Sequence, residues 1–184
     1  MSEATRSGEA TGGGLLRGED VGEDGGIWRL HRETIRPEWI DYNGHMNVAY
    51  YVLVFDHATD AALDRLDLGE AYRQRSGCSV FVAEAHVTYE REVGEGREVE
   101  IASRVLGFDG KRLILYHEMA AAGEDGLVAS NEVLCLHVDL NARRTAPLPA
   151  DASARLAAVA EAHARLNPPL RAGRAIGLGG RRPR

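Results

Sequence analysis

The pattern of apolar and polar residues predicts a strand followed by one long helix. Residues 27–36 alternate between the two classes, as a half-buried strand does, and Pro37 ends this segment. After a turn at 41–45, apolar residues recur every three or four positions, as on one face of a helix. The helix should end near Leu68, because the following Gly69 is a favoured helix stop. The apolar positions are Val48, Tyr51, Val52, Phe55, Thr59, Ala62, Leu63 and Leu66.

The rest of the chain predicts mainly strands. The expected elements are a short helix over 70–74, strands over 79–92, 98–108, 113–119 and 127–138, and a last helix over 152–166. Asp109-Gly110 is a favoured hairpin turn. The strand over 79–92 should present one apolar face, made of Phe81, Ala83, Ala85, Val87 and Tyr89. This order predicts an α+β domain in which an antiparallel sheet wraps around one long helix.

Composition divides the chain into one folded domain and two tails. The 184 residues, 44% of them hydrophobic, suffice for one domain with a sizeable core. Residues 1–26 are rich in Gly, Glu and Ser, so this segment is expected to be disordered. Residues 171–184 are rich in Gly and Arg and are expected to form a flexible tail. The folded domain should therefore span 27–170.

Charge and cysteine content exclude several classes of partner. A net charge of −6 argues against nucleic acid as a general partner. No apolar run approaches the roughly 18 residues of a membrane span, and no secretory signal is present, so no membrane partner is expected. Cys78 and Cys135 lie far apart, without the spacing of a disulfide scaffold or a zinc motif. These features indicate a reducing, cytoplasmic location.

The segment Asp-Tyr-Asn-Gly-His-Met-Asn at 41–47 carries the candidate chemistry, because it leads directly into the long helix. Asp41 could serve as a general base or a nucleophile, and the backbone N–H groups near Val48 and Ala49 could bind an oxyanion at the helix start. Asn47 fits a helix cap. His45 could orient a water or a carbonyl group, or bond a neighbouring strand. On spacing alone, the favoured interpretation is that Asp41 merely closes a turn.

A resemblance to known families reverses that preference. Asp41-x-x-Gly44 resembles the catalytic Asp-x-x-Gly of 4-hydroxybenzoyl-CoA thioesterases. The segment 44–51 resembles the G-H-V-N-x-x-x-Y motif of bacterial long-chain acyl-CoA thioesterases. The resemblance implies a hot-dog fold, hydrolysis of an acyl-CoA thioester, and a homodimer or dimer of dimers with sites between subunits. It implies a catalytic group made of Asp41, His45, Asn47 and Val48.

A closer resemblance concerns the acyl group. Residues 36–47 and 55–60, extended by 89–93 and 136–139, are similar to the betainyl-CoA thioesterases of carnitine catabolism. This implies hydrolysis of betainyl-CoA to glycine betaine and CoA, with no cofactor, because coenzyme A is part of the substrate. The alternatives are a thioesterase for an aromatic or fatty acyl-CoA, and a non-catalytic module that binds acyl-CoA.

Several residues around the motif are candidates for substrate binding. They are Trp39, Tyr42, Asn43, Tyr50, Phe81 and Glu84. Aromatic faces beside acidic groups would suit a quaternary ammonium group, although such clusters usually belong to a core. Arg171 or Arg174 in the tail could reach a CoA phosphate or could simply be solvated.

Glu84 and His86 share one face of their predicted strand. This face could be solvated, or Glu84 could point into the acyl pocket across a dimer. With His45 these residues could form a two-histidine, one-carboxylate metal site. Their spacing matches no recognised metal motif, so no metal is predicted.

Overall fold

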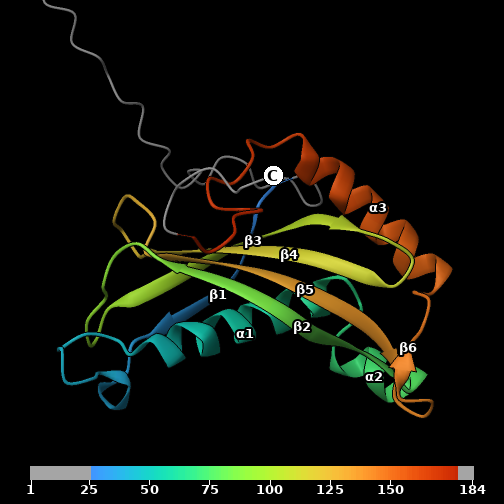
Figure 1. Ribbon diagram of the computed structural model, residues 1–184, viewed down its shortest axis with the longest axis horizontal. Coiled ribbons are helices and arrows are strands. Elements are labelled where there is room, and N and C mark those ends of the chain that lie inside the picture. Colours follow the sequence, from blue (N-terminus) through green and yellow to red (C-terminus); the bar gives the residue numbers. More distant parts are fainter. Residues whose placement is uncertain (1–25, 178–184) are drawn as a thin grey trace, which may run out of the picture.

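The computed structural model of the protein describes residues 26–177, and a curled antiparallel sheet lies at its centre (Figure 1). The strands are β1 (Trp28–Thr34), β2 (Cys78–Tyr89), β3 (Glu98–Phe108), β4 (Arg112–Ala121), β5 (Ala129–Asp139) and β6 (Arg144–Thr145). Their order in the sheet is β1-β3-β4-β5-β2, and β6 pairs with β5. The predicted α+β fold is confirmed. The two-residue β6 was not predicted, because so short a segment carries no periodic signal.

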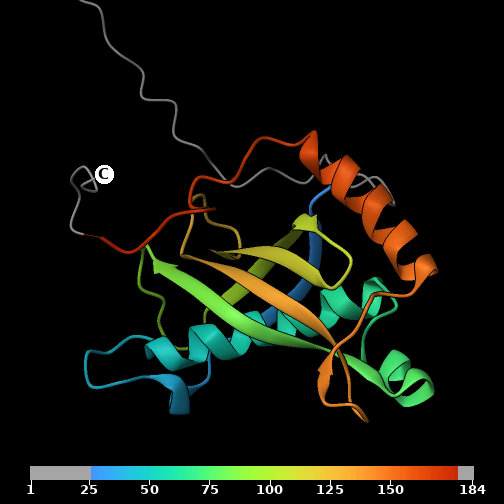
Figure 2. The ribbon, with the colours of Figure 1, turned by 45° about the vertical axis from the view of Figure 1, so that its right-hand side comes forward.

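Helix α1 (Val48–Arg65) packs against the sheet (Figures 1 and 2). It ends three residues earlier than predicted, since Leu66 caps it and Asp67 has a φ of 56°. Gly69 instead caps the start of α2 (Glu70–Ser76). A 3-10 turn, η1 (Pro37–Trp39), follows β1.

The buried face of α1 differs from the predicted one at its first turns. Val48 and Val52 are exposed, whereas Val54 and Ala58 are buried. The buried residues form one stripe, consisting of Tyr51, Val54, Phe55, Ala58, Thr59, Ala62 and Leu63. Both sets obey helical spacing, so periodicity alone could not decide which one faces the sheet.

Strand β2 also departs from the expected pattern. It lies at the edge of the sheet and pairs only with β5 among the described strands. Residues 81–85 are all exposed, so the predicted apolar face containing Phe81, Ala83 and Ala85 does not enter the core of this chain. A register shift between Val82 and Glu84 further disturbs the simple alternation of the strand.

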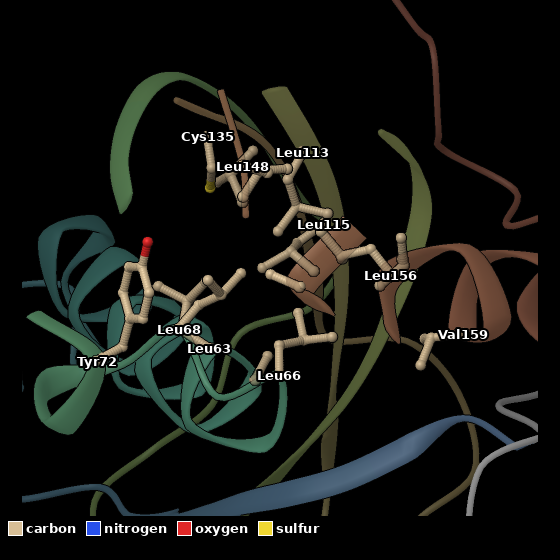
Figure 3. Close-up of a cluster of buried hydrophobic side chains, with 14 of the residues drawn as sticks. Leu63, Leu66, Leu68, Tyr72, Leu113, Leu115, Cys135, Leu148, Leu156 and Val159 are labelled. Atoms are coloured by element: carbon tan, nitrogen blue, oxygen red, sulfur yellow. The ribbon is translucent and has the colours of Figure 1, made fainter. Parts of the chain in front are cut away.

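Helix α3 (Ala150–Ala164) confirms the predicted last helix and packs beside β3, with Leu156, Val159 and His163 buried. Leu156 and Val159 join side chains of α1, β4 and β5 in one hydrophobic cluster (Figure 3). The His163 Nδ1 accepts a hydrogen bond from the Val105 N–H at 2.9 Å. The Nε2 of the same ring donates to the Gly26 carbonyl at 2.9 Å, so this side chain joins three parts of the chain.

The predicted tails lie largely beyond the described residues, which leave out 1–25 and 178–184. The first residues of the predicted flexible tail are held by the folded domain. Arg171 binds Glu90 through two hydrogen bonds of 2.7 Å, and the Gly173 N–H donates to Glu132 at 2.6 Å. Arg171 is therefore engaged with a carboxylate in this structure.

A buried histidine lies between the sheet and α1. The Thr59 hydroxyl donates to the Phe55 carbonyl, so the His117 Nε2–H must donate to Thr59 Oγ1, at 3.1 Å. The His117 Nδ1 then accepts from the Ser103 hydroxyl at 2.7 Å. Burial lowers the pKa of His117 to about 3, so the ring stays neutral in the folded protein.

We expect acid to destabilise the protein through this residue. The unfolded chain binds a proton at His117 near the ordinary pKa of 6.5, whereas the folded chain does so only near 3. The contribution of His117 to the free energy of unfolding is therefore fully present above about pH 6.5, and it falls by up to about 1.4 kcal/mol per pH unit below that pH. His163, whose pKa burial also lowers, acts in the same direction. Urea unfolding at pH 7 and pH 5 measures the change, and equal or greater stability at pH 5 contradicts it.

Candidate active site

The loop before α1 is held in a tight turn by its own backbone. Ile40 and Met46 form an antiparallel bridge across it. The Asp41 N–H donates to the His45 carbonyl, and the Gly44 N–H donates to the Asp41 carbonyl, both at 3.0 Å. Gly44 has a φ of 85°, a conformation that residues with side chains rarely adopt. The loop therefore fixes the position of Asp41 beside the helix start.

The carboxylate of Asp41 is held through one of its oxygens. Its Oδ1 accepts a hydrogen bond from the Asn43 N–H at 2.8 Å, so the Asx turn predicted as the simpler interpretation is present. The other oxygen has no hydrogen-bond partner among residues 26–177. Asp41 is only partly buried. The turn thus orients the carboxylate and leaves Oδ2 available for a water molecule or a substrate.

The start of α1 supplies one backbone donor. The Asn47 side chain accepts from the Ala49 N–H at 3.0 Å, which confirms Asn47 as the helix cap and occupies the Ala49 donor. The Val48 N–H has no acceptor in the described part of the chain. It lies at the positive end of the helix dipole, where negative charge is stabilised. Val48 is therefore the better placed of the two candidate oxyanion donors.

A groove of about 250 Å³ opens beside this helix start. It is lined by His45, Met46, Val48, Tyr51, Tyr89, Glu90, Arg91 and Glu92. The Nε2 of His45 lies 3.6 Å from the Glu92 carboxylate, so the ring faces a charged side chain rather than a strand backbone. Burial raises the pKa of Tyr51, and the charges of Glu92 and Asp41 act in the same direction. The negative charges of Asp41 and Glu92 therefore disfavour ionisation of the Tyr51 hydroxyl in the groove wall.

Sequence reasoning did not assign to the site the part of the groove wall that residues 89–92 form. Tyr89 packs edge-on against Tyr51, with ring centroids 5.2 Å apart, and its hydroxyl donates to the Val48 carbonyl at 3.4 Å. Arg91 binds the backbone carbonyls of residues 125–127, which anchors the end of β2. Glu92 faces His45. The segment 89–93 belonged to the family resemblance, which was the available signal, but nothing local placed it beside Asp41.

Three of the four candidate aromatic residues lie near the motif and occupy different environments. They are Trp39, Tyr42 and Tyr50. Trp39 is 4% exposed and stacks on Tyr50 at 5.2 Å, while the Arg36 guanidinium lies 4.9 Å from the Trp39 ring centre. Trp39 belongs to a core cluster and the half-buried Tyr50 packs against that cluster, whereas Arg36 is exposed. Tyr42 is 97% exposed on the loop beside Asn43. Of the three, Tyr42 therefore has the most accessible ring faces in a single chain.

Phe81 and Glu84 do not line the groove beside Asp41. Phe81 lines a separate hollow with Val138, Leu140, Arg143, Arg144 and Thr145, and Glu84 is exposed in the middle of β2. Phe81 and Tyr89 lie eight positions apart, which is roughly 26 Å of extended strand. Neither residue therefore belongs to the groove wall beside Asp41 within the chain. His45, Glu84 and His86 do not form a metal-binding group among residues 26–177.

Comparisons with known proteins identify the family to which the chain belongs. Residues 35–156 match the thioesterase-like superfamily. The chain is 43% identical over 152 residues to a betainyl-CoA thioesterase from Pseudomonas aeruginosa, covering 83% of this chain and 96% of that protein. It is 42% identical over 122 residues to the L-carnitine dehydrogenase/betainyl-CoA thioesterase of Agrobacterium fabrum, and this match covers 25% of the larger protein.

Solved structures show the same fold. A Pseudomonas putida protein, classed provisionally among the thioesterases, has a TM-score of 0.73 and 37% identity, covering 84% of this chain and 98% of that one. A Staphylococcus aureus protein solved in complex with CoA has a TM-score of 0.76 and 24% identity, covering 83% and 97% respectively. The hot-dog architecture expected from the motif is therefore confirmed. No helix within residues 26–177 has the length and apolar character needed to cross a membrane.

Proposed function

Since the chain belongs to the thioesterase-like superfamily and is a thioester hydrolase, we propose that it hydrolyses betainyl-CoA to glycine betaine and CoA. The observation that carries the proposal is that the loop before α1 leaves one Asp41 carboxylate oxygen available, and that the start of α1 leaves the Val48 N–H available. The identity to the Pseudomonas aeruginosa enzyme, over nearly its whole length, supports the choice of acyl group.

The proposed mechanism needs a base and an oxyanion donor. Asp41 Oδ2 takes a proton from a water molecule, whose oxygen attacks the thioester carbonyl carbon. The negative charge that develops on the carbonyl oxygen is stabilised by the Val48 N–H and the helix dipole. The carbon–sulfur bond then breaks, the proton held by Asp41 passes to the leaving sulfur, and the carboxylic acid and CoA are released with Asp41 again ionised. Attack by Asp41 itself on the carbonyl is the alternative route.

We further propose that the working unit is a homodimer, or a dimer of dimers, whose site lies between subunits. Support comes from the exposed edge strand β2, since an unpaired edge with apolar side chains normally needs a cover. Phe81, Val82 and Tyr89 are exposed along it, as are Val48 and Val52 on the neighbouring face of α1. A partner on this surface could also bring its own Glu84 or Phe81 towards Asp41.

A charge on the edge strand tests the dimer. Val82→Lys is expected to shift the protein to a monomer at micromolar concentration and to lower thioesterase activity, because a lysine there resists burial between two strands. Leu106→Lys, on the exposed surface of β3, is the matched control and should change neither property. Light scattering and thiol release measure both variants. A fully active wild-type monomer at the assay concentration contradicts the proposal.

The acyl group is tested by comparing substrates that differ only in charge. We expect kcat/KM for betainyl-CoA to exceed that for its neutral tert-butylacetyl-CoA analogue by about tenfold or more. Two or three aromatic contacts with the cation, at roughly 0.5–2 kcal/mol each, would supply this difference. Benzoyl-CoA and palmitoyl-CoA test the alternative acyl groups in the same thiol-release assay.

Variants of Tyr42 then assign the cation contact. Tyr42→Leu should reduce the preference for the charged substrate, whereas Tyr42→Phe should keep it, because phenylalanine retains an aromatic face. Equal hydrolysis of the charged and neutral esters by the wild-type protein removes cation recognition and indicates a general short-chain thioesterase.

Free thiols at Cys78 and Cys135 support placing the enzyme in the reducing cytoplasm.

A further inference from the structure

Two histidines and a glutamate meet on the side of α1 that packs against β1. The His31 Nε2 lies 3.1 Å from Glu33 Oε2, and the His57 Nδ1 lies 2.9 Å from the same oxygen. The three candidate ligand atoms all lie within 4.8 Å of one another. We propose that His31, Glu33 and His57 bind a divalent transition metal ion, such as Zn²⁺ or Co²⁺, and thereby tie β1 to α1.

Secondary structure explains why these side chains converge. His31 and Glu33 lie two positions apart on β1, so both point to the same face of the strand. His57 comes from the middle of α1 and reaches them from the packed helix. Its ring also packs edge-on against His31, with centroids 5.5 Å apart. None of the three lines the groove beside Asp41, so this site is separate from the thioesterase site.

The chemistry of the three donors suits such an ion. Imidazole nitrogens favour zinc, cobalt and nickel, and two histidines with one carboxylate form a known three-ligand face with further positions open. With bonds of about 2.1 Å, ligand atoms in neighbouring positions of a six-coordinate ion lie about 3.0 Å apart. The two measured nitrogen–oxygen distances are 3.1 and 2.9 Å. These two separations are compatible with binding to one ion, although hydrogen bonds from the same ring nitrogens to Glu33 give similar distances.

Burial favours a specific site over casual surface binding. The Glu33 side chain is 11% exposed, and those of His31 and His57 are 21% and 38% exposed. An ion can therefore enter from solvent, while the neighbouring strand and helix hold the ligands in place. The other oxygen of Glu33 accepts from Arg36 at 3.1 Å, which orients the carboxylate. The same guanidinium places a positive charge near the ion, so it should weaken binding.

The competing interpretation is a metal-free cluster in which both imidazole N–H groups simply donate to the carboxylate. The two interpretations differ in the metal affinity that they predict for Arg36→Gln. For a metal site, removal of the nearby positive charge tightens binding, whereas for a hydrogen-bonded cluster it gives no metal affinity at all. Arg32→Gln is the matched control, because Arg32 lies on β1 between His31 and Glu33 but pairs with Glu98 and Glu100 and not with Glu33.

Calorimetric titration of the full chain with Zn²⁺ and with Co²⁺ tests the site. We expect one ion per chain, and about tenfold or greater loss of affinity in each of His31→Gln, Glu33→Gln and His57→Gln. His86→Gln, which changes a histidine outside the cluster, should bind as the wild type does. At free metal 100-fold above the wild-type Kd, the melting temperature should rise by about 5–10 °C in the wild type and in His86→Gln, and by less in the three ligand variants. Circular dichroism shows whether each variant is folded.

The outcomes separate this proposal from the thioesterase proposal. Absence of binding at millimolar metal, or binding that survives all three ligand substitutions, overturns the metal site. Thiol release by the metal-free protein is measured independently, so failure of one proposal leaves the other standing.

Discussion

Asp41→Asn is expected to lower kcat/KM for acyl-CoA hydrolysis by about 10²–10⁴-fold, the usual effect of removing a general base. The substitution removes the charge but keeps an oxygen at the position of Oδ1. The Asn43 N–H, which donates to that oxygen at 2.8 Å, therefore retains its acceptor. The turn should persist, so the loss of activity reports on the available second oxygen and not on a collapsed loop.

Thiol release under substrate-limited conditions measures this effect, and circular dichroism establishes that the variant is folded. The chain offers a matched control in Asp139, whose Oδ1 accepts from the Asn141 and Ala142 N–H groups at 2.8 and 2.9 Å. Asp139→Asn changes the same kind of turn without a helix start beside it, and its turnover should stay close to that of the wild type. Near-normal turnover in a folded Asp41→Asn protein removes Asp41 from the mechanism.

Leu156→Ala is expected to lower the free energy of unfolding by about 2–5 kcal/mol, because it leaves a cavity in a packed core. Leu156 is 0% exposed and joins the cluster that contains Leu66, Leu115 and Val159 (Figure 3). This cluster holds α3 against the end of α1, where the Arg155 guanidinium also donates to the Leu66 carbonyl at 3.2 Å. For a protein of this size, the loss corresponds to a fall in melting temperature of about 4–20 °C.

Chemical denaturation of Leu156→Ala and Leu170→Ala measures how much the burial of Leu156 contributes to the free energy of unfolding. Both substitutions remove the same atoms, but Leu170 is 66% exposed. The Leu170→Ala change should stay within about 0.5 kcal/mol, as surface substitutions usually do. A similar cost for the two variants would show that α3 contributes little to the cooperative core.

Local sequence determined much of this protein. Periodicity located the long helix and five of the six strands, because side-chain direction repeats every 3.6 residues in a helix and every two in a strand. The cap at Asn47 followed from residue type, since its side chain can accept a backbone N–H without help from distant residues. The turn at Asp41 followed for the same reason. The short motif around these residues also indicated the family that the comparisons confirm.

The packed face of each element depended on the tertiary structure. Val52 and Val54 both fit a helical stripe, but only Val54 meets the sheet. Phe81 fits an apolar strand face, yet β2 lies at the edge of the sheet, so no neighbour within the chain covers this residue. Spacing describes directions around one element, and burial depends on which other element lies opposite.

The contacts between distant segments were likewise beyond the reach of local sequence. Glu92 meets His45 only because the end of β2 lies beside the loop that precedes α1. His57 meets Glu33, 24 residues earlier, because α1 packs along β1. Hydrogen bonding and metal binding depend on separations of a few ångströms, and chain folding alone brings such distant residues together. The sequence by itself determined the helix, the strands and the turn that holds Asp41, while tertiary packing decided what surrounds them.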